Sequence, residues 1–148
     1  MVRSLEGKHP LYFEAILQLR DVSDDVVAYA RQQIASHAIP TAKAVKLENG
    51  LDFYLADNQF TKSLGKKLQQ RFGGQILMTA SLHTQKKGKD LYRVTVLFRG
   101  LAYKKGDKVV YQGEEYIVRG VGKDIFLMGN KKVHLKYKNA SEIKLSKE

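Results

Sequence analysis

The sequence predicts an α+β protein built in two parts, and three observations support this prediction. Residues 11–100 show strand-like alternation interrupted by two amphipathic helical patterns, in the order βαββαββ, which predicts a two-layer domain. Residues 101–148 contain only short apolar segments separated by glycines, which is typical of a small all-β barrel of the SH3-like type. Hydrophobic residues make up 43% of the 148 residues, enough to form buried cores. Residues 1–10 are polar, and we expect a loose leader there.

The first predicted strand starts at Leu11, where apolar and polar residues begin to alternate, and a helix follows it. Ser23 can cap this helix, and Asp24 and Asp25 favour the positive end of its dipole. Pro40 follows the end of the helical pattern. The inward positions of the strand are Phe13, Ala15, Leu17 and Leu19, and those of the helix are Val27, Ala30 and Ile34.

A hairpin and a second helix come next. Residues 44–47 and 51–56 flank Asn49–Gly50, a pair that tolerates the positive φ values of a two-residue turn. Asp57 or Asn58 caps the second helix, and Gly73–Gly74 ends it. One face of this helix carries an apolar residue at every fourth position, namely Phe60, Leu64, Leu68 and Phe72.

The first part ends in a hairpin of residues 75–82 and 91–99, joined by the basic loop Thr84–Asp90. After Gly100 we expect five short strands, whose closure into a barrel would hide their edges. These strands are Lys108–Tyr111, Glu115–Val118, Ile125–Met128, Val133–Tyr137 and Glu142–Leu145.

The charge of the chain indicates an anionic partner. Lysine and arginine number 26 against 15 aspartates and glutamates, a formal charge of +11. Residues 9–100 carry 13 basic and 8 acidic side chains and residues 101–148 carry 11 and 6, so the two parts are equally positive. Such an excess most often indicates nucleic acid, with an anionic membrane surface second. No apolar run is long enough to span a bilayer, and we expect a cytoplasmic protein without a membrane partner.

The residue patterns needed for catalysis or metal binding are missing from the sequence. The chain has no cysteine, which excludes thiolate chemistry and zinc ribbons. Its four histidines are far apart and lack a ligand spacing. The segment Arg119–Asp124 superficially resembles a phosphate loop, but its spacing fits a hairpin turn. We therefore expect no catalytic residue, no metal and no cofactor.

Candidate RNA-binding residues lie on the second helix, in the basic hairpin and in the second part. On the helix, basic residues are spaced 62/66 and 67/71, so like charges repel at i,i+4 unless an external anion relieves them. A solvated lysine face is the alternative explanation. The candidates are Lys62, Lys66, Lys67, Arg71, Lys86, Lys87, Lys89, Arg93, Lys131, Lys132 and Lys136.

The aromatic residues offer few candidates for base stacking. Tyr12, Tyr54 and Tyr103 are the least committed to a core, although half-buried edge packing is the more common role for tyrosine. The phenylalanines fall on predicted core positions, namely Phe13, Phe53, Phe60, Phe72, Phe98 and Phe126.

Three segments together resemble a known family: Asn49–Ala56, Arg71–Gly74 and Leu91–Arg99. Over about residues 11–145 the chain is similar to the archaeal branch of the large-ribosomal-subunit export adaptors, also called nonsense-mediated decay protein three. The resemblance implies a first part similar to a large-subunit ribosomal protein and a second part similar to the SH3-like domain of translation factor five-A. It also implies contact with ribosomal RNA and ribosomal proteins near the tRNA exit side, and it identifies no catalytic residue.

The family's zinc-binding Cys-x-x-Cys pairs and its acidic, leucine-rich export tail are not present in this sequence. We therefore expect a truncated or specialised relative to which a role in subunit export does not transfer. A separate zinc-bearing partner chain is left open.

The sequence favours a non-enzymatic RNA-binding protein that docks on the large ribosomal subunit or its precursor. Ribosomal RNA and large-subunit ribosomal proteins are the expected partners. Two alternatives stay open: a free-standing factor for tRNA or messenger RNA, and a protein-interaction adaptor that uses the barrel and is basic only for solubility. A nuclease is less favoured, because no two carboxylates can be assigned to one face.

Overall fold

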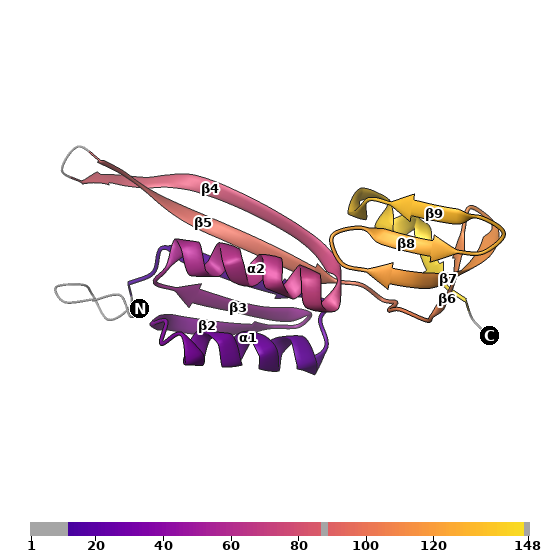
Figure 1. Ribbon diagram of the computed structural model, residues 1–148. Helices are drawn as coiled ribbons and strands as arrows, with labels where there is room; N and C mark the ends of the chain where they lie inside the picture. Colours follow the sequence, from indigo (N-terminus) through magenta and orange to yellow (C-terminus); the bar gives the residue numbers. More distant parts are fainter. Residues whose placement is uncertain (1–11, 87–88, 147–148) are drawn as a thin grey trace.

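The computed structural model describes residues 12–86 and 89–146, without the side chains of residues 83–91. It contains two five-stranded sheets (Figure 1), which confirms the predicted α+β class. Each sheet has a hydrophobic core of its own. The first part comprises β1 (Ala15–Arg20), α1 (Asp24–Ser36), β2 (Thr41–Leu47), β3 (Gly50–Leu55), α2 (Asn58–Phe72), β4 (Gly74–Lys86) and β5 (Lys89–Gly100). The second comprises β6 (Lys108–Tyr111), β7 (Glu114–Val121), β8 (Ile125–Met128), β9 (Lys132–Leu135), the 3₁₀ helix η1 (Tyr137–Glu142) and β10 (Ile143–Leu145).

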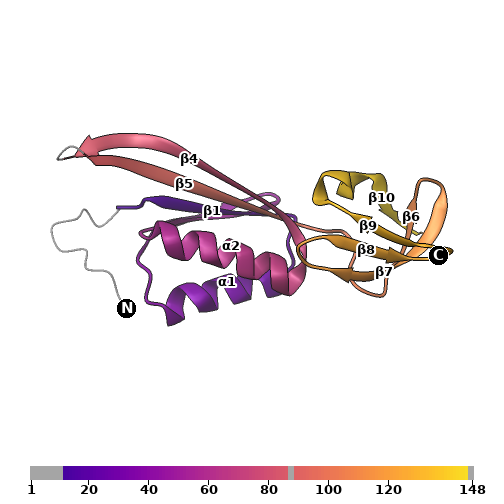
Figure 2. The same ribbon diagram turned by 45° about the horizontal axis from the view of Figure 1, so that its top comes forward.

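The first sheet has the strand order β2-β3-β1-β5-β4, and only the pair β1–β5 is parallel. Both helices lie on the same face of this sheet, which Figure 2 shows from the side. Buried and half-buried residues alternate along β1, so one face of the strand is buried under the helices. Ala15, Leu17 and Leu19 are completely buried, and the residues between them face the other way. Leu64 and Leu68 of α2 pack into the same core. The predicted order βαββαββ is therefore confirmed.

Helix α2 is held firmly at both ends and lies close to the sheet. Asp57 accepts a hydrogen bond from the Phe60 backbone N–H at 2.9 Å, and Gly73 ends the helix at a φ of 75°. A Cβ on Gly65 would lie 2.6 Å from Val96 Cγ1, so a glycine is needed for this close packing. In α1, by contrast, the N-cap residue Ser23 makes no side-chain capping hydrogen bond, although the sequence predicts one.

Two predicted turns of the first part are wrong. The turn between β2 and β3 consists of residues 48–49, and Gly50 already belongs to β3. Gly50 is needed for close approach and not for a positive φ, because a Cβ there would lie 1.9 Å from the Leu19 carbonyl oxygen. The predicted basic loop Thr84–Asp90 is mostly strand, since β4 and β5 stay paired as far as Lys86 and Lys89. The resulting hairpin projects beyond the helices, at the end away from the second sheet (Figure 1).

The second sheet is antiparallel throughout, with the order β10-β6-β7-β8-β9. Its core is formed by side chains such as Val109, Val118, Ile125 and Leu127. Within residues 89–146 no pairing joins the edge strands β9 and β10, so the closed SH3-like barrel is not confirmed. The 3₁₀ helix η1 occupies the place where the sequence predicts the end of one strand and the start of the next.

The two sheets meet where α2 passes into β4. The Tyr137 hydroxyl oxygen accepts hydrogen bonds from the backbone N–H groups of Gly74 (3.2 Å) and Gly122 (3.3 Å), and its proton is donated to the Gly122 carbonyl. A Cβ on Gly73 would lie 2.4 Å from Val121 Cγ2. The junction therefore depends on close backbone contact.

No helix in the part of the chain that the structure describes is long and apolar enough to cross a membrane.

Candidate nucleic-acid interface

Helix α2 presents the densest group of predicted site residues. Its 15 residues include four basic side chains and no acidic one. Lys66 and Lys67 are exposed, as predicted from their positions off the apolar stripe. Arg71 lies in the last turn, where its charge is favourable to the helix dipole. The helix therefore offers fixed cations to an anion outside the protein.

The four cations of α2 do not form one stripe. At about 100° per residue, Lys62 and Lys66 lie on one flank of the helix, and Lys67 and Arg71 lie on the other. The Arg71 guanidinium carbon lies 4.9 Å from the ring centre of Tyr29, so α1 already holds this side chain. Lys66 and Lys67 remain the two cations of α2 most accessible to a phosphate.

Lys62 and Arg93 come together at a groove that the sequence does not reveal. This groove, of about 580 Å³, lies between the start of α2 and the hairpin of β4 and β5. Both side chains are half-buried in its walls, and Tyr92, 48% exposed, is a third lining residue. The Arg93 guanidinium carbon lies 4.0 Å from the ring centre of Phe13. Arg93 is thus already engaged by an aromatic ring.

The stacking candidates and one predicted core residue lie elsewhere than expected. Phe13 is outside the helix-side core and packs edge-on against Tyr54 with ring centres 4.8 Å apart. Lys43 covers Tyr54 at 4.4 Å, so this tyrosine is already occupied. Tyr103 is only 6% exposed and donates a hydrogen bond to the Ala140 carbonyl at 3.3 Å, which excludes it as a stacking platform. Tyr12 is half-buried and lines the groove of Lys62 and Arg93.

The candidates in the hairpin are placed only in part. Lys86 ends β4 and pairs in register with Lys89, the first residue of β5. Lys87 lies outside the described residues. The role of this triplet stays a prediction.

In the second part, two of the three predicted lysines are exposed without an ion pair to another described residue. These are Lys131 and Lys132, at the turn between β8 and β9. The Lys136 ammonium lies 3.6 Å from an Asp124 carboxylate oxygen, which compensates part of its charge. Lys131 and Lys132 are therefore the better candidates for phosphate contacts.

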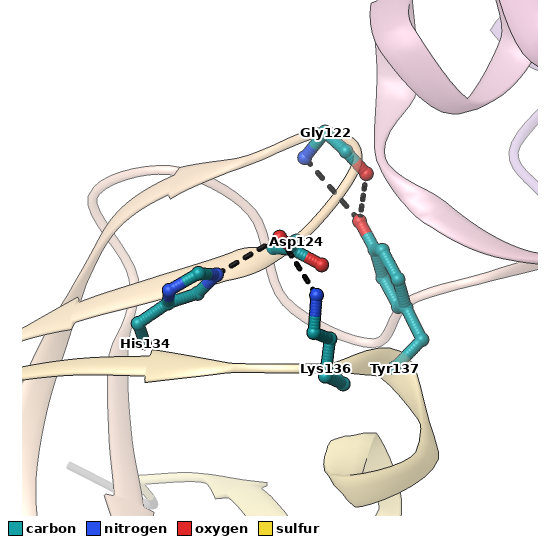
Figure 3. Close-up of polar contacts among 5 residues, drawn as sticks. All are labelled: Gly122, Asp124, His134, Lys136 and Tyr137. Carbon is teal, nitrogen blue, oxygen red and sulfur yellow. Dashed lines mark hydrogen bonds and ion pairs between the residues drawn. The ribbon is translucent and has the colours of Figure 1, made fainter.

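Figure 3 shows a polar cluster around Asp124 that sequence reasoning missed. His134 Nε2 lies 2.9 Å from Asp124 Oδ2, and Lys136 approaches the same oxygen. The hydrogen bond with His134, together with the charge of Lys136, holds the pKa of Asp124 below its usual value. The i,i+2 spacing of His134 and Lys136 across the end of β9 was the available signal, since it places both side chains on one face.

One predicted core residue of the second part is at the surface. Phe126 is 43% exposed, and its ring stacks on that of His134, with centres 4.7 Å apart and planes at 18°. In the regions that the structure describes, no group of three or more His, Cys, Asp or Glu side chains could hold a metal ion. The exposed side chains of this sheet thus include an aromatic pair and two lysines without an ion pair to a described residue.

Comparison with known families accounts for the first part of the chain. Residues 12–99 match the family model described as NMD3, second domain. The chain belongs to the NMD3 family. This family is associated with the large ribosomal subunit. No curated protein matches the chain.

Proposed function

We propose that this NMD3-family protein is a non-enzymatic RNA-binding protein that docks on the large ribosomal subunit or its precursor. Ribosomal RNA and large-subunit ribosomal proteins are its partners in this proposal. Membership of the family supports the ribosomal location. We also propose that the second sheet is a small module of the SH3-like type, which is supported by five short antiparallel strands around one core.

One observation carries the proposal of RNA binding: each part exposes a pair of lysines without a neutralising acid. Lys66 and Lys67 lie on a helix that contains no acidic residue. Lys131 and Lys132 make no ion pair with another residue of the described regions. A phosphate backbone that contacts such cations releases counterions, and this release drives binding without base-specific contacts.

Two charge-reversed variants of the full chain test this proposal. Lys66→Glu with Lys67→Glu removes the pair on α2, and Lys131→Glu with Lys132→Glu removes the pair on the second sheet. Each variant should weaken binding to purified large subunits and to their ribosomal RNA. Each lost phosphate contact should also reduce the slope of log K against log salt by about 0.7–0.9.

The matched control reverses two exposed lysines outside both surfaces, Lys46→Glu with Lys105→Glu. This control changes the net charge by the same amount, so it measures the effect of charge alone. Unchanged affinity and salt slope in both test variants would contradict the proposal and favour a protein-interaction adaptor. Tighter binding to tRNA or messenger RNA than to ribosomal RNA would instead favour a free-standing RNA-binding factor.

A further inference from the structure

The outer face of the second sheet exposes a row of apolar side chains. In β7 and β8 the residues Val118, Ile125 and Leu127 point into the core. Their neighbours point outward, and Ile117, Phe126 and Met128 are 48%, 43% and 37% exposed. A contiguous row of exposed apolar side chains, unlike a single one, marks a surface that contacts a partner.

One face of the Phe126 ring is covered by a neighbouring ring, that of His134. Phe126 pairs in register with His134 on β9, and the two rings stack nearly parallel at 4.7 Å. His134 is itself fixed by Asp124, whose carboxylate lies 2.9 Å from Nε2. The centre-to-centre distance equals the usual spacing of adjacent strands, so the stack runs across the strands in the direction of the hydrogen bonds.

The row of stacked rings does not continue onto β7, because the residue there has no side chain. On the other side of Phe126 the register partner on β7 is Gly120, beside a bulge between Val118 and Gly120. A Cβ built on Gly120 would meet no atom within 4 Å, its chain neighbours Arg119 and Val121 left aside. The face of the Phe126 ring that His134 does not cover therefore borders open space of the width that a side chain on β7 would fill.

The two strands that neighbour β8 each carry an exposed cation near Phe126. Arg119, the bulge residue next to Gly120, is exposed. Lys132 is exposed at the start of β9, opposite Met128. A planar group on Phe126 would thus have a cation within reach on each neighbouring strand, which suits a nucleotide, because its base is flat and its phosphate is anionic.

We propose that Phe126 is a stacking platform for an unpaired RNA base, which occupies the space above Gly120 and forms a third ring in the row with Phe126 and His134. Arg119 and Lys132 contact the phosphates of that nucleotide. This inference rests on the proposed function, and it adds a preference for single-stranded RNA that lysines alone do not provide.

The test measures the affinity of the full chain for a 12-nucleotide oligouridine and for an RNA duplex of the same length, by fluorescence anisotropy. Phe126→Ala removes the platform and should weaken binding to the oligouridine by roughly 5- to 150-fold, the range for one stacked base. Gly120→Val should weaken it as well, because its side chain fills the space. Gly120 has no positive φ and no atom crowds its Cβ position, so valine is compatible with the fold.

Two variants serve as controls. Phe126→Tyr keeps the ring and should retain the affinity of the original protein. Met128→Ala removes a neighbouring exposed apolar side chain and should leave the affinity nearly unchanged. Affinity for the duplex should be the same in all four variants, because bases within a duplex are not available for stacking.

The outcomes separate this inference from the function it rests on. If the unmodified chain binds neither RNA, both proposals fail. If it binds RNA in a salt-dependent way and Phe126→Ala has unchanged affinity for the oligouridine, only the stacking platform is overturned. If Phe126→Ala and Met128→Ala equally reduce the recovery of large-subunit proteins without affecting oligouridine binding, the face belongs to a protein partner and the stacking platform is again overturned.

Discussion

The two parts of the molecule carry the same excess of positive charge but hold their cations differently. Among the described residues of the first part, four basic side chains lie over aromatic rings: Arg31 over Phe53, Lys43 over Tyr54, Arg71 over Tyr29 and Arg93 over Phe13. In the described residues of the second part no such contact occurs, and the exposed aromatic ring of Phe126 is covered by His134. Net charge is therefore a poor measure of the charge available to a partner. In the first part Lys66 and Lys67 are available to a partner, and in the second part so are lysines on the sheet where one face of the Phe126 ring is uncovered.

Each part has its own hydrophobic core, so we expect the two parts to unfold separately, and core substitutions test this most strongly. Leu68→Ala in the first core and Leu127→Ala in the second each remove a side chain that is at most 1% exposed. Each should cost about 2–5 kcal/mol. We expect two calorimetric transitions, of which each substitution lowers only one. A single transition lowered by both would show one cooperative unit, and the predicted boundary near residue 101 would then be wrong.

The second-largest expected effect is a loss of stability of the second part at alkaline pH. Burial, with a smaller contribution from Tyr137, raises the pKa of Tyr103 to about 12. Burial also raises the pKa values of Tyr116 and Tyr137. An unfolded tyrosine ionises near pH 10, so the unfolded state loses its proton first and stability falls as the pH rises from about 10 to 12. One such group contributes at most about 1.4 kcal/mol per pH unit.

The measurement is thermal unfolding of the second transition at several pH values between 8 and 12. Tyr103→Phe removes the ionisable group and should flatten this pH dependence, while the first transition serves as the internal control. An equal pH dependence in Tyr103→Phe and in the original protein would show that burial of Tyr103 does not control the alkaline limit.

The smallest effect concerns Arg71, which the sequence groups with the free lysines of α2. Because Arg71 lies over Tyr29, Arg71→Ala should destabilise the first part by about 0.5–1 kcal/mol. Lys67→Ala on the same flank should leave stability unchanged and reduce RNA affinity more than Arg71→Ala does. Denaturant unfolding and RNA titration of both variants provide the comparison. A larger loss of RNA affinity in Arg71→Ala than in Lys67→Ala would show that Arg71 contacts the RNA.

The sequence predicts the elements of the first part well, because its patterns are one-sided. Leu17 and Leu19 alternate with polar residues, and Leu64 and Leu68 repeat at helical spacing, so each element has one face that must be buried. The segment Ile125–Met128 is apolar on both faces, and alternation could not decide that Phe126 points outward. The outward direction of Phe126 follows from its pairing with β7 and β9, which no local pattern encodes.

The sequence predicts correctly those candidate residues for which only exposure to solvent had to be predicted. Lys66, Lys67, Lys131 and Lys132 are exposed, as their positions in the pattern predict. The engagement of Arg93 by Phe13 joins residues 80 positions apart, and it depends on the strand order of the first sheet. Similarly, the open space above Gly120 exists only because β8 lies between β7 and β9.

The junction at Tyr137 has a consequence for the kind of partner that this protein can recognise. One hydroxyl group joins the backbones of Gly74 and Gly122, so the lysines of α2 and those of the second sheet are held at a set spacing. Once one surface has bound, the other searches a small volume, and its effective concentration reaches roughly the millimolar range. If both surfaces bind RNA as proposed, an RNA whose phosphates match this spacing gains avidity, and an RNA with the same charge in another arrangement does not. Under the proposed function, recognition would therefore depend on the shape of the RNA as well as on its charge.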